Sequence, residues 1–400
     1  MKSQSDQATS AQWRLKMYPL AVLVAMAVGL VVLGLQANDS EAPAQTVGGD
    51  FPAFYGAGVI AADGDWENLY DFERQAEAQA DLQEEAGTVR YFAYPPQVAA
   101  AHAPLAAFDY GTAYLIYTAL MFGMLVLAIK LAEPMLPWLR GRTVLASAIA
   151  LSFWPMLRAV TGGSNTALSL LLVVAGWRLI HDDRHFGAGL VLAGLLFKPQ
   201  LAVPLIGLML IVRLYRVVAG ASAGAVVFYL SGVPFGGASW PVDWWETARA
   251  FNVIDSEVNG YSSVSWLGFL ENALGVGEIV PVALGWGLAI ATVLGLVWLW
   301  HRNGAQRLPE LLAVAMPGIL LLSPHALSHD TAILLLTFAV LHRAASLPRW
   351  LIAASWTLAA AQVFIRALGF SPGFFLLLLV TWFTVTTLGL VRTRRVVLSP

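Results

Sequence analysis

Long runs of apolar residues, separated by short polar segments, dominate the chain. The first run is MYPLAVLVAMAVGLVVLGLQ, at residues 17–36. Further runs lie at residues 109–131, 143–160, 166–180, 187–197, 201–212, 215–233, 277–300, 310–323, 330–342, 350–366 and 371–390. A helix needs about 20 apolar residues to cross the hydrocarbon of a bilayer. The pattern therefore predicts an all-α, polytopic integral membrane protein with about twelve transmembrane helices.

The first run follows a polar tail, residues 1–16, which carries Lys2, Arg14 and Lys16. A cleaved signal peptide has an apolar core of only about 7–15 residues. The longer run at residues 17–36 therefore favours a retained membrane anchor, with the tail in the cytoplasm.

The region 187–212 contains Lys198-Pro199 in its middle. Proline removes a helical hydrogen bond and restricts the residue before it, so we expect the helix to break there. With this break as an outer turn, the arginine clusters after the later spans fall on the cytoplasmic side, as the positive-inside rule requires. The charges therefore predict a multi-pass protein of the cell (inner) membrane with both termini inside.

Two long loops then lie on the extracytoplasmic side, at residues 37–108 and 234–276. The first holds twelve acidic residues and two arginines. Within it, residues 66–86 show helical spacing of apolar residues, which predicts an amphipathic helix on the membrane surface. The second loop is rich in tryptophan and tyrosine, which favour the headgroup zone. The whole chain, 1–400, is predicted to be one membrane-embedded domain.

Composition supports this class and excludes others. The chain is 58% hydrophobic and 12% charged, and its mean hydropathy is +0.67. A net charge of −2 without a basic patch argues against a nucleic-acid partner. The absence of cysteine excludes disulfides and thiolate metal sites. No P-loop, dinucleotide fingerprint or GxSxG elbow is present, and we expect no cofactor.

The polar residues that are hardest to explain by packing fall on the predicted outer face. Asp50 lies in GGDFPAFYGAG (48–58), and Arg158 precedes TGGSN (161–165). The other three segments are YFAYPPQ (91–97), FKPQ (197–200) and SPHALSHD (323–330). Five segments far apart in sequence thus meet one side of the membrane, which indicates a single site near the interface.

Purely structural interpretations remain open for several of these residues. Asp50 is well placed to cap a helix that has Pro52 in its first turn. Tyr94-Pro95-Pro96 suits a stiff turn, and residues 162–165 have the composition of a tight turn. Lys198 suits a side chain that extends to the lipid headgroups.

The cluster of His325, His329 and Asp330 favours function, because ionisable groups at membrane depth are costly. His325 and His329 have the i, i+4 spacing that two metal ligands on one helix use. However, no third ligand and no glutamate base accompany them, so we expect no metal.

These residue types suit the transfer of a sugar from an anionic lipid. Asp50 can act as general base on an acceptor hydroxyl. Lys198, His325 and Arg158 can stabilise the charge on a departing phosphate. The candidate sugar and acceptor contacts are Tyr55, Tyr94, Gln97, Asn165, Gln200, His329 and Asp330.

The order of several blocks resembles glycosyltransferase family 87 over roughly residues 48–340. These blocks are GGDFPAFYGAG, LYDFE (69–73), FAYPP with PLAAFDYGTAYLIY (104–117), GGSNTALSLLL, AGLLFKPQLAVPLIGL and LLSPHALSHD. The chain departs from the family pattern at Gly163, where many relatives have glutamine, and at His329, where an aromatic residue is common.

The resemblance implies a C-type glycosyltransferase fold with amphipathic loop helices outside the membrane. It implies an inverting enzyme that moves a hexose, mannose in the best-known members, from a polyprenyl-phosphate donor to an envelope glycolipid or glycan. By the same resemblance Asp50 is the base, and Lys198 and His325 engage the donor phosphate.

Two other classes of function fit the hydrophobic pattern. A transporter or flippase would move a lipid-linked intermediate without making bonds, and such carriers often show paired repeats, which we do not find here. A structural scaffold explains the hydrophobicity but not the clustered acid, lysine and histidines.

Overall fold

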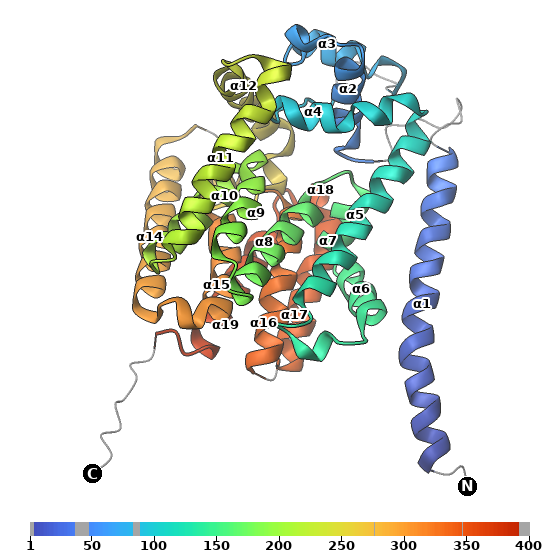
Figure 1. Ribbon diagram of the computed structural model, residues 1–400, viewed down its shortest axis with the longest axis vertical. Helices are drawn as coiled ribbons and strands as arrows, with labels where there is room; N and C mark the ends of the chain where they lie inside the picture. Colours follow the sequence, from blue (N-terminus) through green and yellow to red (C-terminus); the bar gives the residue numbers. More distant parts are fainter. Residues whose placement is uncertain (1–3, 37–47, 83–88, 276, 346, 392–400) are drawn as a thin grey trace. The chain divides into compact units, whose positions relative to one another are not determined.

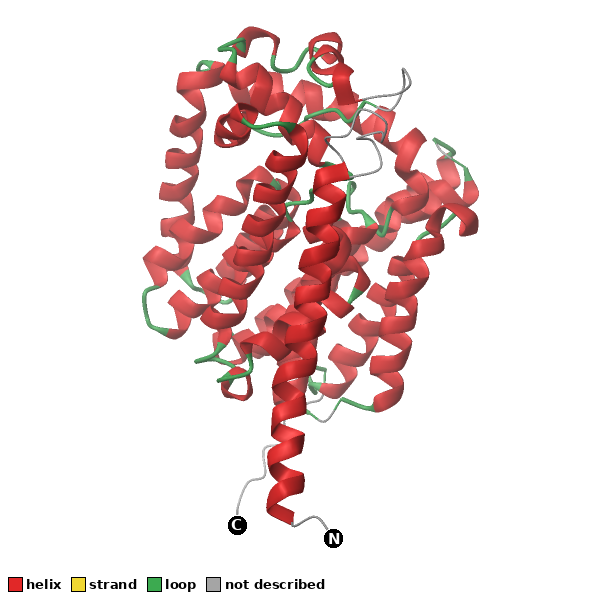
Figure 2. Ribbon diagram, turned by 90° about the vertical axis from the view of Figure 1, so that its right-hand side faces the viewer, coloured by secondary structure: helices red, strands yellow, loops and turns green. Residues whose placement is uncertain are grey.

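The computed structural model describes residues 4–36, 48–82, 89–275, 277–345 and 347–391. This part of the chain is helical and contains no strand, which confirms the all-α class (Figure 2). It divides into two compact units, the first made of Met1–Pro199 with Ala219–Val258 and the second of Gln200–Val218 with Asn259–Pro400. Each unit is described by itself.

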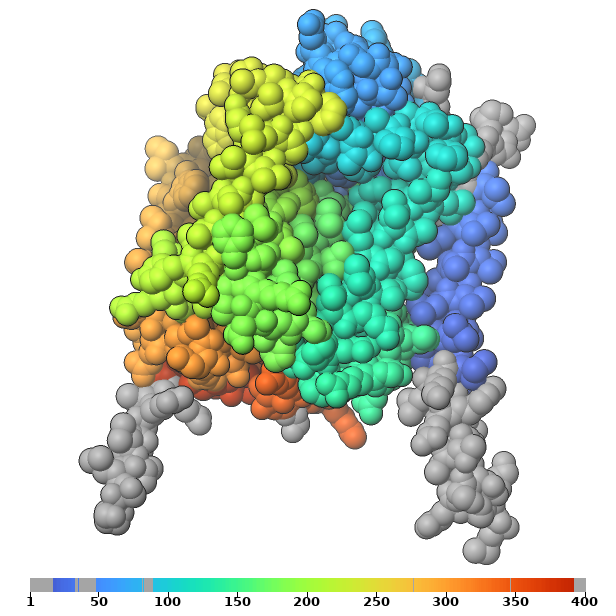
Figure 3. Space-filling view, in the orientation of Figure 1, coloured from blue at the N-terminus to red at the C-terminus, as the bar shows by residue number. Residues whose placement is uncertain are grey.

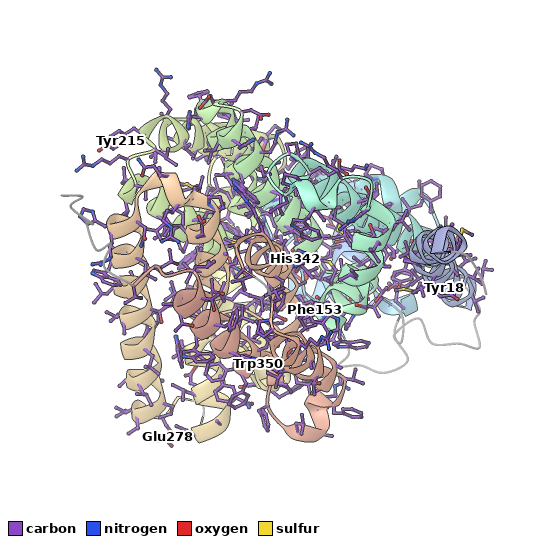
Figure 4. All side chains as sticks on the ribbon, turned by 90° about the horizontal axis from the view of Figure 1, so that it is seen from below. Tyr18, Phe153, Tyr215, Glu278, His342 and Trp350 are labelled. Atoms are coloured by element: carbon purple, nitrogen blue, oxygen red, sulfur yellow. The ribbon has the colours of Figure 1, made fainter. Side chains whose placement is uncertain are left out.

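The first unit is built around α5 and α8, which pack against each other (Figure 1). Its helices are α1 (Gln4–Gln36), α2 (Phe51–Ala62), α3 (Phe72–Glu77), α4 (Pro96–His102), α5 (Tyr110–Ala132), α6 (Thr143–Ser152), α7 (Trp154–Thr161), α8 (Thr166–His181), α9 (His185–Ala193), most of α11 (Tyr215–Gly236) and α12 (Trp240–Asn259), with the short 3₁₀ helices η2 (Trp66–Asn68), η3 (Ala80–Leu82), η4 (Ala103–Ala107), η5 (Pro137–Leu139) and η6 (Gly194–Phe197). In the space-filling view the α2–α4 segment, blue to cyan, covers one end of α5 (Figure 3). The long α1 packs on α5 and α6, with Tyr18 exposed on it (Figure 4).

The second unit has α15 at its centre. Its helices are α10 (Pro199–Ile211), the start of α11, α13 (Trp266–Leu274), α14 (Ile279–Asn303), α15 (Leu308–Leu322), α16 (Leu334–Ala344), α17 (Arg349–Ala361), α18 (Ile365–Leu368) and α19 (Pro372–Thr387), with η7 (Gly260–Ser262), η8 (Ala305–Arg307), η9 (Ser328–Ile333) and η10 (Gln362–Phe364). Buried residues lie on all sides of α15, as expected of a helix that is apolar all round. It packs against α14, α16 and α19.

The apolar runs all form helices, but fewer of them have the length of a full crossing than the sequence predicts. Within the described residues, five helices are long and apolar enough to span a membrane, and the bent pair α6–α7 would make six. Six further apolar helices have 10–17 residues. The structure thus supports a membrane protein with five or six candidate spans, and the count of twelve stays a prediction.

The run at residues 143–160 is broken rather than continuous. Helices α6 and α7 meet at 93°, with the extended backbone of Phe153 between them. Pro155 lies in the first turn of α7, where its missing N–H is tolerated. The Phe153 side chain, labelled in Figure 4, is fully buried at the bend. The break at Lys198-Pro199 was predicted for the same reason and is confirmed, because η6 ends at Phe197 and α10 begins at Pro199.

The single surface helix predicted at residues 66–86 is wrong. This stretch folds as η2, α3 and η3, with residues 83–86 outside the described part. The helical spacing of apolar residues gave a wrong prediction because two polar residues of this stretch face inward. Gln75 and Gln79 are each only 1% exposed.

These two glutamines hold the extended residues that follow. Gln75 accepts a hydrogen bond from the N–H of Phe92 at 2.7 Å and donates to its carbonyl at 3.2 Å. Gln79 does the same with Arg90 at 3.1 and 2.9 Å. Two amide side chains thus take the place of a neighbouring strand.

Two aromatic side chains complete this arrangement. Trp244 of α12 donates its indole N–H to the carbonyl of Ala93 at 3.0 Å. The Tyr70 hydroxyl donates to the carbonyl of Tyr94 at 2.9 Å. We call residues 90–94 the clamped segment. Since it leads directly into Pro95 and α4, it fixes the start of the YPPQ block.

Candidate functional site

Asp50 occupies the N-cap position of α2, and Pro52 lies in the first turn of that helix. Its backbone is in the right-handed helical region, with φ −91° and ψ −10°, and its side chain makes no capping hydrogen bond. A capping side chain usually stands on an extended backbone and accepts from the second or third helical N–H. The position predicted for a cap is therefore correct, but the carboxylate is not used as one.

The backbone around Asp50 packs directly on the turn between α7 and α8. The N–H of Asp50 donates to the carbonyl of Gly162 at 2.8 Å, and that of Phe51 donates to Gly48 at 2.8 Å. Gly163 has φ +73°, and a Cβ there would overlap the backbone of Gly48 and Phe51. Only glycine allows this approach. That requirement gives a physical reason for glycine at position 163 of this chain.

Three successive carbonyls of this turn are each taken by a donor from elsewhere in the first unit. Tyr114 donates its hydroxyl to the carbonyl of Thr161 at 2.8 Å. The carbonyl of Gly162 receives the amide of Asp50, and Tyr117 donates to the carbonyl of Gly163 at 3.0 Å. We call residues 161–163 the held turn.

An aromatic cluster supports the same contact. The ring of Phe51 lies 5.4, 5.9 and 5.0 Å from the rings of Tyr110, Tyr114 and Tyr117. These tyrosines recur at helical spacing, so they share one face of α5. Phe51 is thus fixed by contacts with the three tyrosine rings, and Asp50 is fixed by the hydrogen bond from its backbone N–H.

Arg158 brings a positive charge to this place. It lies on α7 one turn before Gly162, and a Cβ on Gly49 would lie 2.5 Å from both terminal nitrogens of its guanidinium. The two glycines therefore leave the room that the guanidinium fills. Asp50 thus meets Arg158 and the held turn, both more than 100 residues further along the chain, within one unit.

Two of the predicted sugar contacts in the first unit, Tyr55 and Tyr94, already have structural partners. Tyr55 donates its hydroxyl to the carbonyl of Phe108 at 2.9 Å, and burial, with a smaller contribution from Asp109, raises the pKa of the Tyr55 phenol. The Tyr94 ring packs on Phe54 and Phe197 at 5.1 and 6.5 Å.

Two amides retain hydrogen-bonding capacity. Gln97 donates to the carbonyl of Phe228 at 3.2 Å, and its Oε1 is buried without a hydrogen-bond partner. Asn165 is 5% exposed, and its Oδ1 is likewise buried without a partner. A buried amide oxygen without a donor is costly, so both atoms suit a ligand hydroxyl.

Lys198 is 5% exposed, so it does not extend into the headgroups as the structural interpretation had it. Its backbone is non-helical, with φ −129° and ψ 76°, at the break between η6 and α10, and its N–H donates to the carbonyl of Leu195 at 2.7 Å. A lysine this buried is rare unless it is paired.

The remaining predicted residues belong to the second unit. Gln200 lies in the first turn of α10. Asp330 accepts a hydrogen bond from the N–H of Leu327 at 3.1 Å, which closes the loop locally, and His329 Nε2 is 3.9 Å from Asp330 Oδ1. His325 is half-buried in the same loop. The meeting of this loop with Asp50 stays a prediction.

Sequence reasoning missed Tyr114 and Tyr117, although a signal was present. Three tyrosines at one helical face are unusual in an otherwise apolar run such as residues 109–131, because a buried hydroxyl requires a partner. For a metal, the described residues contain no cluster of three or more His, Asp or Glu that could hold one.

The apolar helices are those of a membrane protein. At the start of α2 the Asp50 amide lies on the held turn, and the Arg158 guanidinium lies against Gly49. A family model for glycosyltransferase family 87 matches residues 92–324, which is 233 of the 400 residues. The chain belongs to this family, and its activity is that of a glycosyltransferase. The match begins after Asp50 and ends just before His325.

No curated protein matches the chain, and no solved structure matches it.

Proposed function

We propose that the protein is an inverting glycosyltransferase that moves a hexose, mannose by family resemblance, from a polyprenyl-phosphate donor. The acceptor is an envelope glycolipid or glycan, and the reaction takes place on the extracytoplasmic face of the cell membrane. The observation that carries the proposal is the placement of Asp50: its backbone amide is bonded to the held turn, and the Arg158 guanidinium lies against the neighbouring Gly49.

The chemistry follows from that placement. The Asp50 carboxylate takes the proton of an acceptor hydroxyl as its oxygen attacks the anomeric carbon. A new C–O bond forms on the side opposite the phosphate, so the configuration inverts. The bond between the anomeric carbon and the phosphate oxygen breaks, and polyprenyl phosphate leaves with the electron pair.

Cations are needed where the leaving group gains charge. Arg158, whose guanidinium lies against Gly49 in the first unit, is assigned to this role, and Lys198 and His325 are assigned to the donor phosphate on the same proposal. Gln97 and Asn165, with their unpartnered buried oxygens, are assigned to sugar hydroxyls. Tyr55, Tyr94, Gln200, His329 and Asp330 complete the proposed sugar and acceptor contacts.

The proposed membrane arrangement is that of the C-type superfamily. The shorter apolar helices other than α2, together with α16, complete about twelve crossings with both termini inside. The loops at residues 37–108 and 234–276 then lie outside with the site, and the donor reaches it laterally through the lipid.

The test uses the full-length protein in vesicles with radiolabelled polyprenyl-phosphate mannose and an extract of envelope glycolipids. Wild type is expected to form a new labelled glycoside. Asp50→Asn is expected to insert normally and to transfer roughly 10²–10⁴-fold more slowly, the usual contribution of a general base. Asp63→Asn, an exposed acid of the same loop, is the matched control and keeps its rate.

Near-wild-type turnover in Asp50→Asn would refute the base assignment. Label that changes sides without forming a glycoside would instead identify a carrier. For Lys198→Ala and His325→Ala we expect weaker apparent donor binding, and unchanged affinity in both would remove them from the phosphate role.

A further inference from the structure

The held turn is joined to α5 by two hydroxyl groups that no part of the proposed chemistry uses. Tyr114 and Tyr117 donate to the carbonyls of Thr161 and Gly163, on either side of Gly162. The tyrosine side chains are 2% and 3% exposed. The Tyr117 bond is buried and the Tyr114 bond is partly buried, and away from water a hydrogen bond is strong and its loss is costly.

The geometry makes the turn a rigid support. Tyr114 and Tyr117 are three residues apart on α5 and face the same side. Their rings also contact the ring of Phe51 at 5.9 and 5.0 Å. The same two side chains thus hold the turn and the first residue of α2, and neither can shift alone.

Asp50 lies between these two fixed points. Its amide donates to the carbonyl of Gly162 at 2.8 Å, the central carbonyl of the held turn. The Asp50 carboxylate also interacts electrostatically with the Tyr117 hydroxyl. A displacement of the turn therefore moves the backbone from which the carboxylate extends.

We propose that Tyr114 and Tyr117 are positioning residues for Asp50, acting through the held turn. The inference rests on the proposed function, since it requires Asp50 to be the base. Neither tyrosine takes part in proton transfer. Their hydroxyls set where the carboxylate stands relative to the acceptor oxygen, and a displacement of about 1 Å at a reacting group is enough to lower a rate on the order of 10²-fold.

The test removes the hydroxyls and keeps the rings. Tyr117→Phe and Tyr114→Phe are each expected to lower kcat by about 10–10²-fold, with the donor KM changed by less than about twofold because ground-state binding is retained. Tyr229→Phe is the matched control. Its hydroxyl also donates to a turn carbonyl, that of Ala238 at 3.1 Å, and we expect its kcat to stay at the wild-type value.

A double-mutant cycle separates positioning from a general structural effect. In the Asp50→Asn background, Tyr117→Phe is expected to cause no further loss, because there is no base left to misplace. A loss that persists in that background, or wild-type kcat in both single variants, would overturn the positioning role while leaving Asp50 as the base. Wild-type turnover in Asp50→Asn alone would overturn the base assignment of the proposed function, and the positioning role with it. Unchanged melting in detergent confirms that each Phe variant is folded, and Tyr114→Phe decides the case if Tyr117→Phe is not.

Discussion

The clamped segment and the held turn solve one physical problem in two ways. Both are irregular backbone in the first unit, and buried irregular backbone must find partners for its N–H and C=O groups. In the clamped segment, Gln75 and Gln79 supply both a donor and an acceptor to each residue that they hold. In the held turn, single hydroxyls and one amide take three successive carbonyls.

The difference lies in what each arrangement allows. Amide pairs reproduce a strand ladder and require no glycine among the residues that they hold. The held turn lies backbone to backbone against the residues before α2, and this closeness restricts Gly163 to glycine. We infer that the clamped segment stabilises the fold of the first unit, whereas the held turn fixes the position of the Asp50 backbone.

The largest expected effect is on the free energy of unfolding, and it tests the restriction of position 163 to glycine. Gly163→Ala combines a left-handed backbone, which costs about 1–2 kcal/mol, with overlap against Phe51 and Gly48, which adds about 1–3 kcal/mol. Gly64→Ala is a close control, because Gly64 has φ +74° and open space around its Cβ position. Thermal unfolding in detergent should show a shift at least twice as large for Gly163→Ala, with transfer lost. Equal shifts in the two variants would show that the close approach contributes nothing.

The second largest effect on the free energy of unfolding is expected in the clamped segment. Gln75→Leu fills a similar volume but leaves both polar groups of Phe92 buried without partners, which we expect to cost about 2–4 kcal/mol. Gln306→Leu, at an exposed position, should stay within about 0.5 kcal/mol of wild type. Denaturation of both variants measures the difference. A stable Gln75→Leu protein would mean that water reaches the clamped segment.

The helices were predictable from the sequence because apolar periodicity is a local property. The breaks were predictable only in part. Lys198-Pro199 was identified, while the bend at Phe153 was missed although Pro155 carries the same signal. The prediction of a single helix at residues 66–86 failed for a different reason. Periodicity says which face is polar, but not that Gln75 and Gln79 face the clamped segment rather than water.

For the site, sequence reasoning named Asp50, Arg158 and the glycine turn, and the structure places them together in one unit. It could not find the tyrosine bonds, because Tyr114 and Thr161 are 47 residues apart and no local pattern connects them. The motif reports which residue types are present. Which carbonyl each donor takes is decided by the packing of α5 against α7 and α8.

A smaller effect is expected at the far end of the clamped segment. Trp244→Phe keeps an aromatic ring but loses the indole bond to Ala93, at a cost of about 0.5–1.5 kcal/mol. The neighbouring Trp245 is 58% exposed, so Trp245→Phe should change the free energy of unfolding little. If the two variants have the same melting temperature, water replaces the hydrogen bond of the Trp244 indole, and the clamped segment is held by its glutamines alone.

The smallest effect is a pH dependence outside both regions, where Arg74 of α3 pairs with Asp65 and Asp63 at 2.9 and 2.8 Å. The hydrogen bond from Arg74, with one from Asn68, lowers the pKa of Asp65. A carboxyl whose pKa is lower in the folded state stabilises the fold above its unfolded pKa, about 3.9. That contribution is lost as the pH falls through the folded value.

Asp65→Asn should therefore lower stability slightly at neutral pH and flatten its decline below about pH 4. Salt should reduce the difference from wild type, since exposed pairs are screened. Glu67→Gln, an exposed acid nearby, serves as the control and keeps the wild-type pH profile. An effect of Asp65→Asn as large as that of Gln75→Leu would contradict the view that buried neutral bonds, rather than surface charges, hold this part of the first unit.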